Sequence, residues 1–183
     1  TNAEPAAWVE GRTQVETVFD FWNDQATPAN NIVVKYNKFS GVVETNVLFA
    51  RNENVTVTNN AFLNFGRDAI RCEGGYNYGV WTFDKNVFKN DEVSANNGIY
   101  FQSVSGIKED KYQEIVITNN TFENIGIAEN APSIYNGALS MRTYQEKGLK
   151  VDVLYNTFKN CVNYLRFRNN GANFDMIGMS LYP

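Results

Sequence analysis

Apolar and polar residues alternate in short segments that recur along the chain, at 32–39, 55–62, 81–88, 115–122 and 151–158. Each segment has apolar residues five and three positions before an asparagine, and a phenylalanine two positions after it. A period of two is typical of a β-strand whose alternate side chains share one face. We therefore predict a strand that ends at the asparagine, which tolerates the left-handed conformation of a turn. The phenylalanine is expected to point back into the same interior.

A second, weaker strand pattern follows each copy, at 46–51, 68–73, 98–102, 138–142 and 164–168. The residues expected to point inward are Leu48 and Ala50, Ile70 and Cys72, Ile99 and Phe101, Leu139 and Met141, and Leu165 and Phe167. Regular strands joined by loops of unequal length predict a solenoid whose coils stack in parallel. The repeated asparagines should then bond to one another as a ladder beside stacked phenylalanines. The ladder would contain Asn37, Asn60, Asn86, Asn120 and Asn156.

The repeated V-x-V-x-x-N-x-F-x-N register resembles the right-handed parallel β-helix of the pectate-lyase-like class, over residues 30 to 170. The resemblance implies an all-β solenoid of about six coils. We expect one domain over 1–183, with a degenerate first coil at 1–30, regular coils at 31–170 and a C-terminal coil at 171–183. A leucine-rich repeat is the rival fold, and the lack of helical stretches between the strands argues against it. Because the chain starts at Thr1, we expect a module of a larger secreted protein.

Composition restricts the chemistry available to the protein. The 183 residues include 16 Lys plus Arg, 20 Asp plus Glu, 27 Asn and no His, which gives a formal net charge of −4. The lack of histidine removes His-based nucleophilic and general-base catalysis. A net negative charge without clustered cations argues against nucleic acid or an anionic membrane as the partner. Carboxylates, Arg, Lys, Tyr and a calcium ion with oxygen ligands remain.

Known enzymes of this fold class give specific patterns to test. The Asn-Thr-Asp, Asp-Asp and Gly-His-Gly motifs of polygalacturonase-type hydrolases are absent. Trp81 and Asp84 are similar to part of the pectate lyase Trp-x-x-Asp-His pattern, but Lys85 replaces the histidine. Lyases of this fold also use an arginine or lysine base with calcium, so Arg142 or Arg168 could serve as a base. A lyase or hydrolase acting on acidic polysaccharide therefore stays open as an alternative.

The outward positions of the second strands form two rows. The first row is Phe49, Arg71, Tyr100, Ser140 and Arg166, and the second is Arg51, Glu73, Gln102, Arg142 and Arg168. A solvated sheet face is one interpretation. The other is a sugar-binding surface, because planar donors bond hydroxyl groups and aromatic faces stack on sugar rings. The candidate carbohydrate-binding residues are Arg71, Glu73, Tyr100, Gln102, Arg142, Tyr144, Arg166 and Arg168.

Two further residue types have candidate roles. Asp91 and Glu92 form an acidic pair that could bind calcium, although they lack the regular spacing of a dedicated calcium loop, and surface solubility also explains them. Cys72 and Cys161 are too few for a disulfide framework. Because both lie among apolar neighbours, we expect buried free thiols.

A small, acidic, histidine-free β-helix with aromatic loops resembles the β-helical carbohydrate-binding modules of bacterial extracellular glucanases, family 54. This resemblance implies noncatalytic binding of a polysaccharide such as β-1,3-glucan, xylan or chitin, secretion from a bacterium, and a site for structural calcium. A structural surface-layer or adhesin segment is a third interpretation. An uncapped β-helix end exposes strand edges, so we also expect another segment of the precursor to cover the N-terminal coil.

Overall fold

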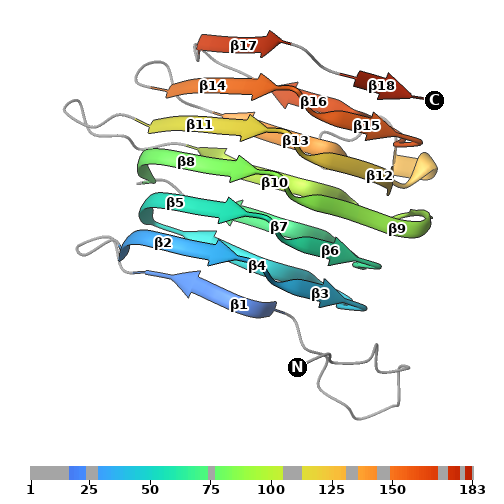
Figure 1. Cartoon of the computed structure of the whole chain (residues 1–183), viewed down its shortest axis with the longest axis horizontal. Coiled ribbons are helices and arrows are strands. Elements are labelled where there is room, and N and C mark those ends of the chain that lie inside the picture. Colours follow the sequence, from blue (N-terminus) through green and yellow to red (C-terminus); the bar gives the residue numbers. More distant parts are fainter. Residues whose placement is uncertain are drawn as a thin grey trace.

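The computed structural model describes residues 17–23, 29–73, 77–104, 113–130, 136–143, 149–168, 173–177 and 180–182. Strands dominate this part of the chain, and its one helical element is a 3₁₀ turn, Ala128–Asn130. The strands form three six-stranded parallel sheets (Figure 1). The first sheet contains β1 (Thr17–Trp22), β4 (Thr45–Ala50), β7 (Asp68–Glu73), β10 (Asn97–Val104), β13 (Gly137–Thr143) and β16 (Leu165–Arg168).

The other two sheets continue each coil. The second sheet contains β2 (Ala29–Lys35), β5 (Asn52–Thr58), β8 (Tyr78–Asp84), β11 (Gln113–Thr118), β14 (Leu149–Leu154) and β17 (Asn173–Ile177). The third sheet contains β3 (Lys38–Ser40), β6 (Ala61–Leu63), β9 (Val87–Ser94), β12 (Thr121–Ile125), β15 (Thr157–Lys159) and β18 (Ser180–Tyr182). In Figure 1 the front strands run left to right and the rear strands return while the chain climbs, so the coil is right-handed.

The predicted parallel β-helix is therefore confirmed, with one addition. The sequence pattern indicated at least two strands per coil, and the structure has three. The short segment around each repeated phenylalanine forms a strand of its own in the third sheet. Three of these strands, β3, β6 and β15, have only three residues, which is too short for alternation to be recognised from the sequence alone.

The predicted asparagine ladder is present at the corner between the second and third sheets. From Asn37 to Asn120, each ladder residue donates from its backbone N and its Nδ2 to the Oδ1 of the next ladder residue, at 2.9–3.1 Å. The Nδ2 groups of Asn60, Asn86, Asn120 and Asn156 also donate to backbone carbonyl oxygens of the preceding coil. The ladder thereby joins five successive coils through hydrogen bonds that are buried from Asn60 onward and partly buried at Asn37.

The left-handed residue of this corner differs from the prediction. The ladder asparagines themselves do not adopt the left-handed backbone conformation. The residue before each of them does, with φ between 54° and 58°, at Tyr36, Asn59, Lys85, Asn119 and Tyr155. This placement turns the chain one residue early and leaves the ladder side chains directed at the neighbouring coils.

Stacked phenylalanines fill the interior beside the ladder. Phe39, Phe62, Phe88, Phe122 and Phe158 are buried. Successive ring centroids lie 4.7–5.0 Å apart, and the ring planes differ by 3–7°. This spacing matches the distance between hydrogen-bonded strands, so each coil adds one ring to a continuous stack.

One copy of the first sheet has a different register from the prediction. Val47 pairs with Ile70 and Phe49 pairs with Cys72, so Val47 and Phe49 point inward and Leu48 lies in the outward row of Arg71. Either Leu48 and Ala50 or Val47 and Phe49 could have faced the interior of this strand. The observed register buries the larger pair, and the Phe49 ring stacks 5.3 Å from Phe21 and contacts Trp81. The outward position predicted for Phe49 and the inward position predicted for Leu48 are wrong.

The same shift removes Arg51 from the row of Glu73, where Ala50 stands instead. Arg51 adopts a φ of 59°, and its guanidinium lies 5.4 Å from the Trp22 ring centroid. In the other four copies the predicted inward residues face the interior, fully buried in β7, β10 and β13 and partly buried in β16. Residues 1–16, which belong to the predicted degenerate first coil, lie outside the described residues.

Candidate functional site

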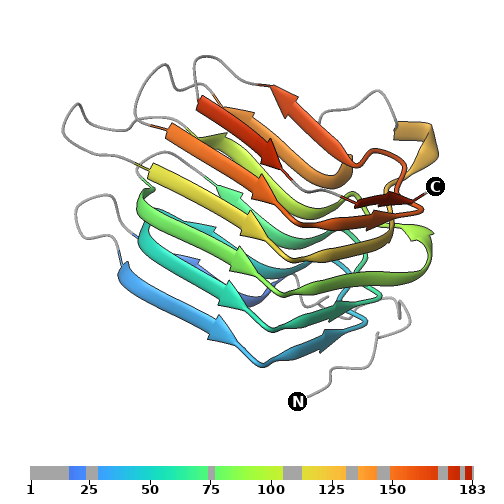
Figure 2. The same ribbon diagram turned by 45° about the horizontal axis from the view of Figure 1, so that its top comes forward.

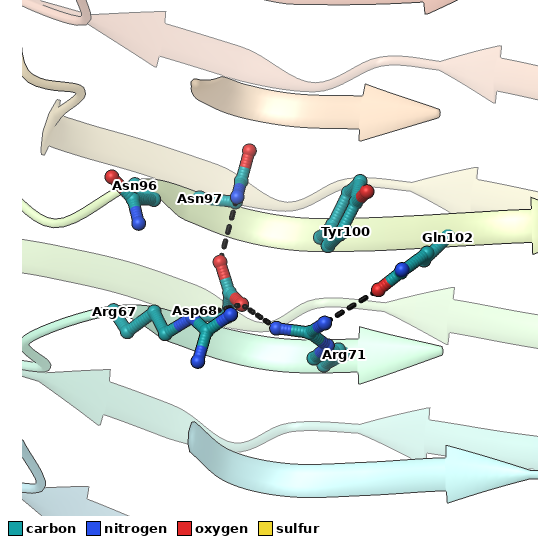
Figure 3. A pocket seen from close by; sticks show the side chains of 7 residues that line it. All are labelled: Arg67, Asp68, Arg71, Asn96, Asn97, Tyr100 and Gln102. Carbon is teal, nitrogen blue, oxygen red and sulfur yellow. Dashed lines mark hydrogen bonds and ion pairs between the residues drawn. The ribbon is translucent and has the colours of Figure 1, made fainter. Parts of the chain in front are cut away.

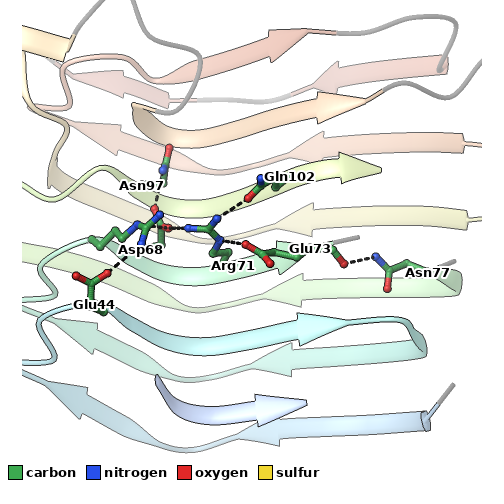
Figure 4. Close-up of polar contacts among 8 residues, drawn as sticks. Glu44, Asp68, Arg71, Glu73, Asn77, Asn97 and Gln102 are labelled. Carbon is green, nitrogen blue, oxygen red and sulfur yellow. Dashed lines mark hydrogen bonds and ion pairs between the residues drawn. The ribbon is translucent and has the colours of Figure 1, made fainter. Parts of the chain in front are cut away.

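A polar cluster centred on Arg71 lies on the outward side of the first sheet (Figures 3 and 4). The Arg71 Nε donates to Glu73, its Nη2 donates to Gln102 of the next coil, and its Nη1 lies 3.4 Å from Asp68 Oδ2. The guanidinium also lies 5.5 Å from the ring centroid of Tyr100. Arg71 is thus held in one orientation by four side chains on β7 and β10.

Asp68 anchors the start of β7 beneath this arginine. Its side chain is only 2% exposed, and its Oδ1 accepts a 2.6 Å hydrogen bond from Asn97 Nδ2. Arg67 Nε lies 3.7 Å from Asp68 Oδ2. Burial raises the pKa of the Asp68 carboxyl above its usual value, while the hydrogen bond from Asn97 and the charges of Arg71 and Arg67 offset part of that rise. The carboxylate therefore fixes both arginines at the base of the cluster.

Two hollows adjoin at these arginines. The first, of about 230 Å³, is lined by Arg67, Asp68, Arg71, Asn96, Asn97, Tyr100 and Gln102 (Figure 3). The second, of about 370 Å³, is lined by Thr17, Glu44, Thr45, Leu48, Arg67, Arg71 and Glu73. We call the two hollows together the Arg71 groove. Its lining extends from β1 through β4 and β7 to β10, and therefore follows the direction in which the coils stack.

Four of the predicted carbohydrate-binding residues meet at this groove: Arg71, Glu73, Tyr100 and Gln102. Tyr100 lies in the predicted outward row, because it pairs with Arg71 and Ser140. It is nevertheless 3% exposed, and Ser140 is fully buried. The expectation that Tyr100 faces solvent was therefore wrong. Replacing Tyr100 by alanine would disturb packing as well as any ligand, so this substitution is not a clean test of binding.

The remaining predicted binding residues lie farther along the first sheet or outside the described part. Arg142 of β13 and Arg166 of β16 are partly buried and continue the two outward rows. Neither belongs to the described lining of the Arg71 groove. The backbone of Arg168 pairs with Arg142, but the Arg168 side chain and all of Tyr144 lie outside the described residues.

The sequence interpretation missed several residues of the site. Arg67 and Asp68 precede or begin β7, Asn97 begins β10, and Glu44 precedes β4. Arg67 Nη1 donates to Glu44 Oε2 at 3.1 Å, which ties the groove to the preceding coil. Alternation within a strand gives no clear direction for a residue that precedes the strand or begins it. The available signal was the pair of Asp68 and Asn97, which are polar and stand at equivalent strand starts.

The predicted calcium ligands lie on a different corner. Asp91 and Glu92 border a hollow of about 370 Å³ together with Asn64 and Ser94. Asp91 Oδ2 accepts from Asn64 Nδ2 at 2.8 Å, and the Asp91 backbone N donates to Asn64 Oδ1 at 2.9 Å. Within the described residues, no group of three or more Cys, Asp or Glu side chains could hold a metal ion. Calcium binding at this corner remains a prediction from the sequence.

The two cysteines are free, as predicted. Cys72 is fully buried in the core, and burial raises the pKa of its thiol well above the usual value. Cys161 is only partly buried, and burial raises the pKa of its thiol to about 11. Neither thiol lines the Arg71 groove, so the candidate site has no nucleophilic sulfur among its described residues.

The fold places the protein in the structural class of parallel β-helices. Comparison with known proteins found no matching family model, no matching curated protein and no matching solved structure. In the described part of the chain, no helix has the length and apolar character needed to cross a membrane. The groove and its chemistry are therefore the basis for assigning a function to this protein.

Proposed function

We propose that the protein is a noncatalytic polysaccharide-binding module and that it holds its ligand in the Arg71 groove. The observation that carries this proposal is the fixed guanidinium of Arg71, held by Asp68, Glu73 and Gln102 against the Tyr100 ring. A side chain that is ordered before the ligand arrives loses little conformational entropy on binding. Planar donors positioned in this way suit the hydroxyl groups of sugars.

The groove offers both hydrogen-bond donors and acceptors, as a sugar hydroxyl requires. Arg67 and Arg71 supply N–H donors, and Glu44 and Glu73 supply carboxylate acceptors. Two arginines against the three carboxylates of Glu44, Asp68 and Glu73 give a net charge of −1 for the cluster. A strongly anionic polymer would gain little from this balance. The charge therefore favours a neutral polysaccharide such as a β-glucan, xylan or chitin over a uronic-acid polymer.

The dimensions of the groove suit part of a linear chain. Its hollows of about 230 and 370 Å³ are at or below the small end of typical ligand pockets. Their lining crosses four successive strands of the first sheet, so a bound chain can extend along the stacking direction. We propose, in line with the resemblance to carbohydrate-binding module family 54, that the module is secreted by a bacterium and accompanies a glucanase.

Binding to insoluble β-1,3-glucan, xylan and chitin, measured by depletion of the protein from solution, tests this proposal. An assay for unsaturated or reducing-end products should accompany it. Arg67 lines both hollows with a side chain that is 46% exposed. Arg67→Ala should lower the affinity about 10-fold, the equivalent of about 1.4 kcal/mol. The fold should persist, because Asp68 retains its ion pair with Arg71 and its hydrogen bond from Asn97.

Lys89→Ala is the matched control for this variant. Lys89 lies on the third sheet, carries the same charge, has a side chain that is 44% exposed, and pairs with Glu123. Its removal should leave the affinity unchanged. If the Arg67 variant bound as tightly as the wild type, the Arg71 groove would not be the binding site. Product formation would support the alternative of a lyase or hydrolase, and the absence of both binding and product would leave a structural or adhesin role.

A further inference from the structure

Two tyrosines stand out at the corner between the second and third sheets. Tyr36 is 75% exposed and Tyr155 is 60% exposed, the highest values among the exposed large hydrophobic residues of the described chain. Both adopt the left-handed conformation, with φ of 58° and 57°. They occupy equivalent positions, each directly before a ladder asparagine, in the first and last coils of the ladder.

Backbone preference does not explain a tyrosine at either position, and within the described residues the one contact of the Tyr36 ring given by the structure is the Lys35 ammonium, 6.0 Å from the ring centroid. A bulky residue with positive φ is an outlier, whereas asparagine adopts this conformation readily. The chain itself uses Asn59 and Asn119 at the equivalent corners of two intervening coils. The exposed tyrosine rings also gain little from burial. A strained conformation that the fold does not require is a reason to look for a function.

The corner residues form a straight ridge along the protein. Figure 2 shows the corners between the second and third sheets stacked one above another. The stacked phenylalanines beside them set a step of 4.7–5.0 Å per coil. Four steps of strand spacing therefore separate Tyr36 from Tyr155 by about 19 Å. We call the five exposed corner residues the corner strip: Tyr36, Asn59, Lys85, Asn119 and Tyr155.

The polar residues between the two rings are already positioned. Asn119 Nδ2 donates to Asp84 Oδ1 at 2.8 Å, and Asn59 Nδ2 donates to Thr58 Oγ1 at 2.9 Å. Lys85 Nζ lies 3.4 Å from Asp84 Oδ2, so its charge is locally balanced. The strip thus presents an aromatic face at each end and amide groups between them, without a strong net charge.

We propose that the corner strip is a second contact surface for a neutral polysaccharide, separate from the Arg71 groove. A chain lying parallel to the coil axis would stack sugar rings on Tyr36 and Tyr155, because the apolar face of a sugar ring packs against an aromatic face. The amides of Asn59 and Asn119 would bond hydroxyl groups between them. This inference rests on the proposed function for the class of ligand. Two surfaces on one rigid module would raise its avidity for an insoluble polymer that offers many chains.

The sharpest test replaces both tyrosines by asparagine, the residue found at the equivalent corners of two intervening coils. The double variant Tyr36→Asn and Tyr155→Asn should bind insoluble glucan, xylan or chitin about 10-fold more weakly than the wild type, in proportion to the loss of two stacked rings. Its melting temperature should be unchanged or higher, because asparagine relieves the backbone strain. A loss of binding without a loss of stability separates a contact role from a structural one.

Two control variants complete the experiment. Lys89→Asn introduces the same residue on the third sheet, outside the corner strip, at a side chain that is 44% exposed, and it keeps both rings, so its affinity should match that of the wild type. The double variant Tyr36→Phe and Tyr155→Phe keeps the rings without the hydroxyls and should also bind. A loss of affinity in the Lys89 variant equal to that of the double asparagine variant would overturn the role of the rings.

The proposals for the corner strip and for the Arg71 groove can be contradicted independently of each other. Wild-type affinity in the double asparagine variant, combined with weak binding by Arg67→Ala, would overturn the strip and leave the groove. The opposite pattern would support the strip and overturn the groove. If the wild-type protein bound none of the three polysaccharides, both proposals would be wrong.

Discussion

Replacing Asn120 by alanine is expected to lower the free energy of unfolding by about 3 kcal/mol, because several buried polar groups lose their partners at once. Asn120 is 1% exposed. Its Oδ1 accepts from the backbone N and the Nδ2 of Asn86, and its Nδ2 donates to Phe83 O and to Asn156 Oδ1, all at 2.8–3.0 Å. Urea unfolding followed by circular dichroism measures the loss.

Asn37→Ala provides the matched control at the end of the ladder. Asn37 is partly exposed, and its Nδ2 donates to Lys35 O and Asn60 Oδ1. After its removal Asn60 Oδ1 still accepts from the backbone N of residue 37, so the cost should be about 1 kcal/mol. Equal costs at the two positions would contradict the argument that the buried, doubly bonded ladder residues stabilise the coil stack.

The ladder and the phenylalanine stack could be predicted because both repeat at fixed positions within a local pattern. The last coil shows the limit of that approach. β17 pairs with β14 and β18 pairs with β15, so the register continues. Leu181, however, stands where the other copies have the phenylalanine. The repeat pattern therefore did not identify the individual strands of this coil, although a C-terminal coil was expected at 171–183.

The candidate site was predictable only in part. Arg71 and Gln102 follow from alternation within strands, which places them outward on neighbouring coils. Arg67 and Asp68 lie where β7 begins, and alternation gives no direction for residues in a turn. The burial of Tyr100 depends on packing above the sheet, which a strand pattern does not encode. The register of β4 was ambiguous because either Leu48 or Phe49 could have been buried.

The same scaffold positions both proposed binding surfaces. Each residue of the corner strip directly precedes a ladder asparagine, so the hydrogen bonds of the ladder hold the strip in line. On the first sheet, the parallel pairing of β7 with β10 sets Glu73 opposite Gln102, and Arg71 bonds to both. Sites built on a rigid element lose little entropy when a ligand binds. Variants that weaken the coil stack should therefore weaken binding at both surfaces.

The largest loss of stability is expected for Phe122→Ala, at about 3–5 kcal/mol. The Phe122 ring is fully buried between Phe88, 4.7 Å away, and Phe158, 4.9 Å away. It also packs closely on the backbone of β10, since a Cβ atom at Gly98 would lie 2.8 Å from the ring. Contacts on three sides prevent the cavity from collapsing, so most of the lost packing is not recovered.

Phe39→Ala tests this explanation at the N-terminal end of the stack. Phe39 stacks on Phe62 on one side, and Phe19 meets it edge-on. It is also slightly exposed, at 6%, whereas Phe122 is fully buried. Its replacement should therefore cost less than that of Phe122, and Phe122→Leu, which refills part of the volume, should also cost less. If the Phe39 and Phe122 alanine variants unfolded at the same urea concentration, the continuous ring stack would not be the main source of stability in this β-helix.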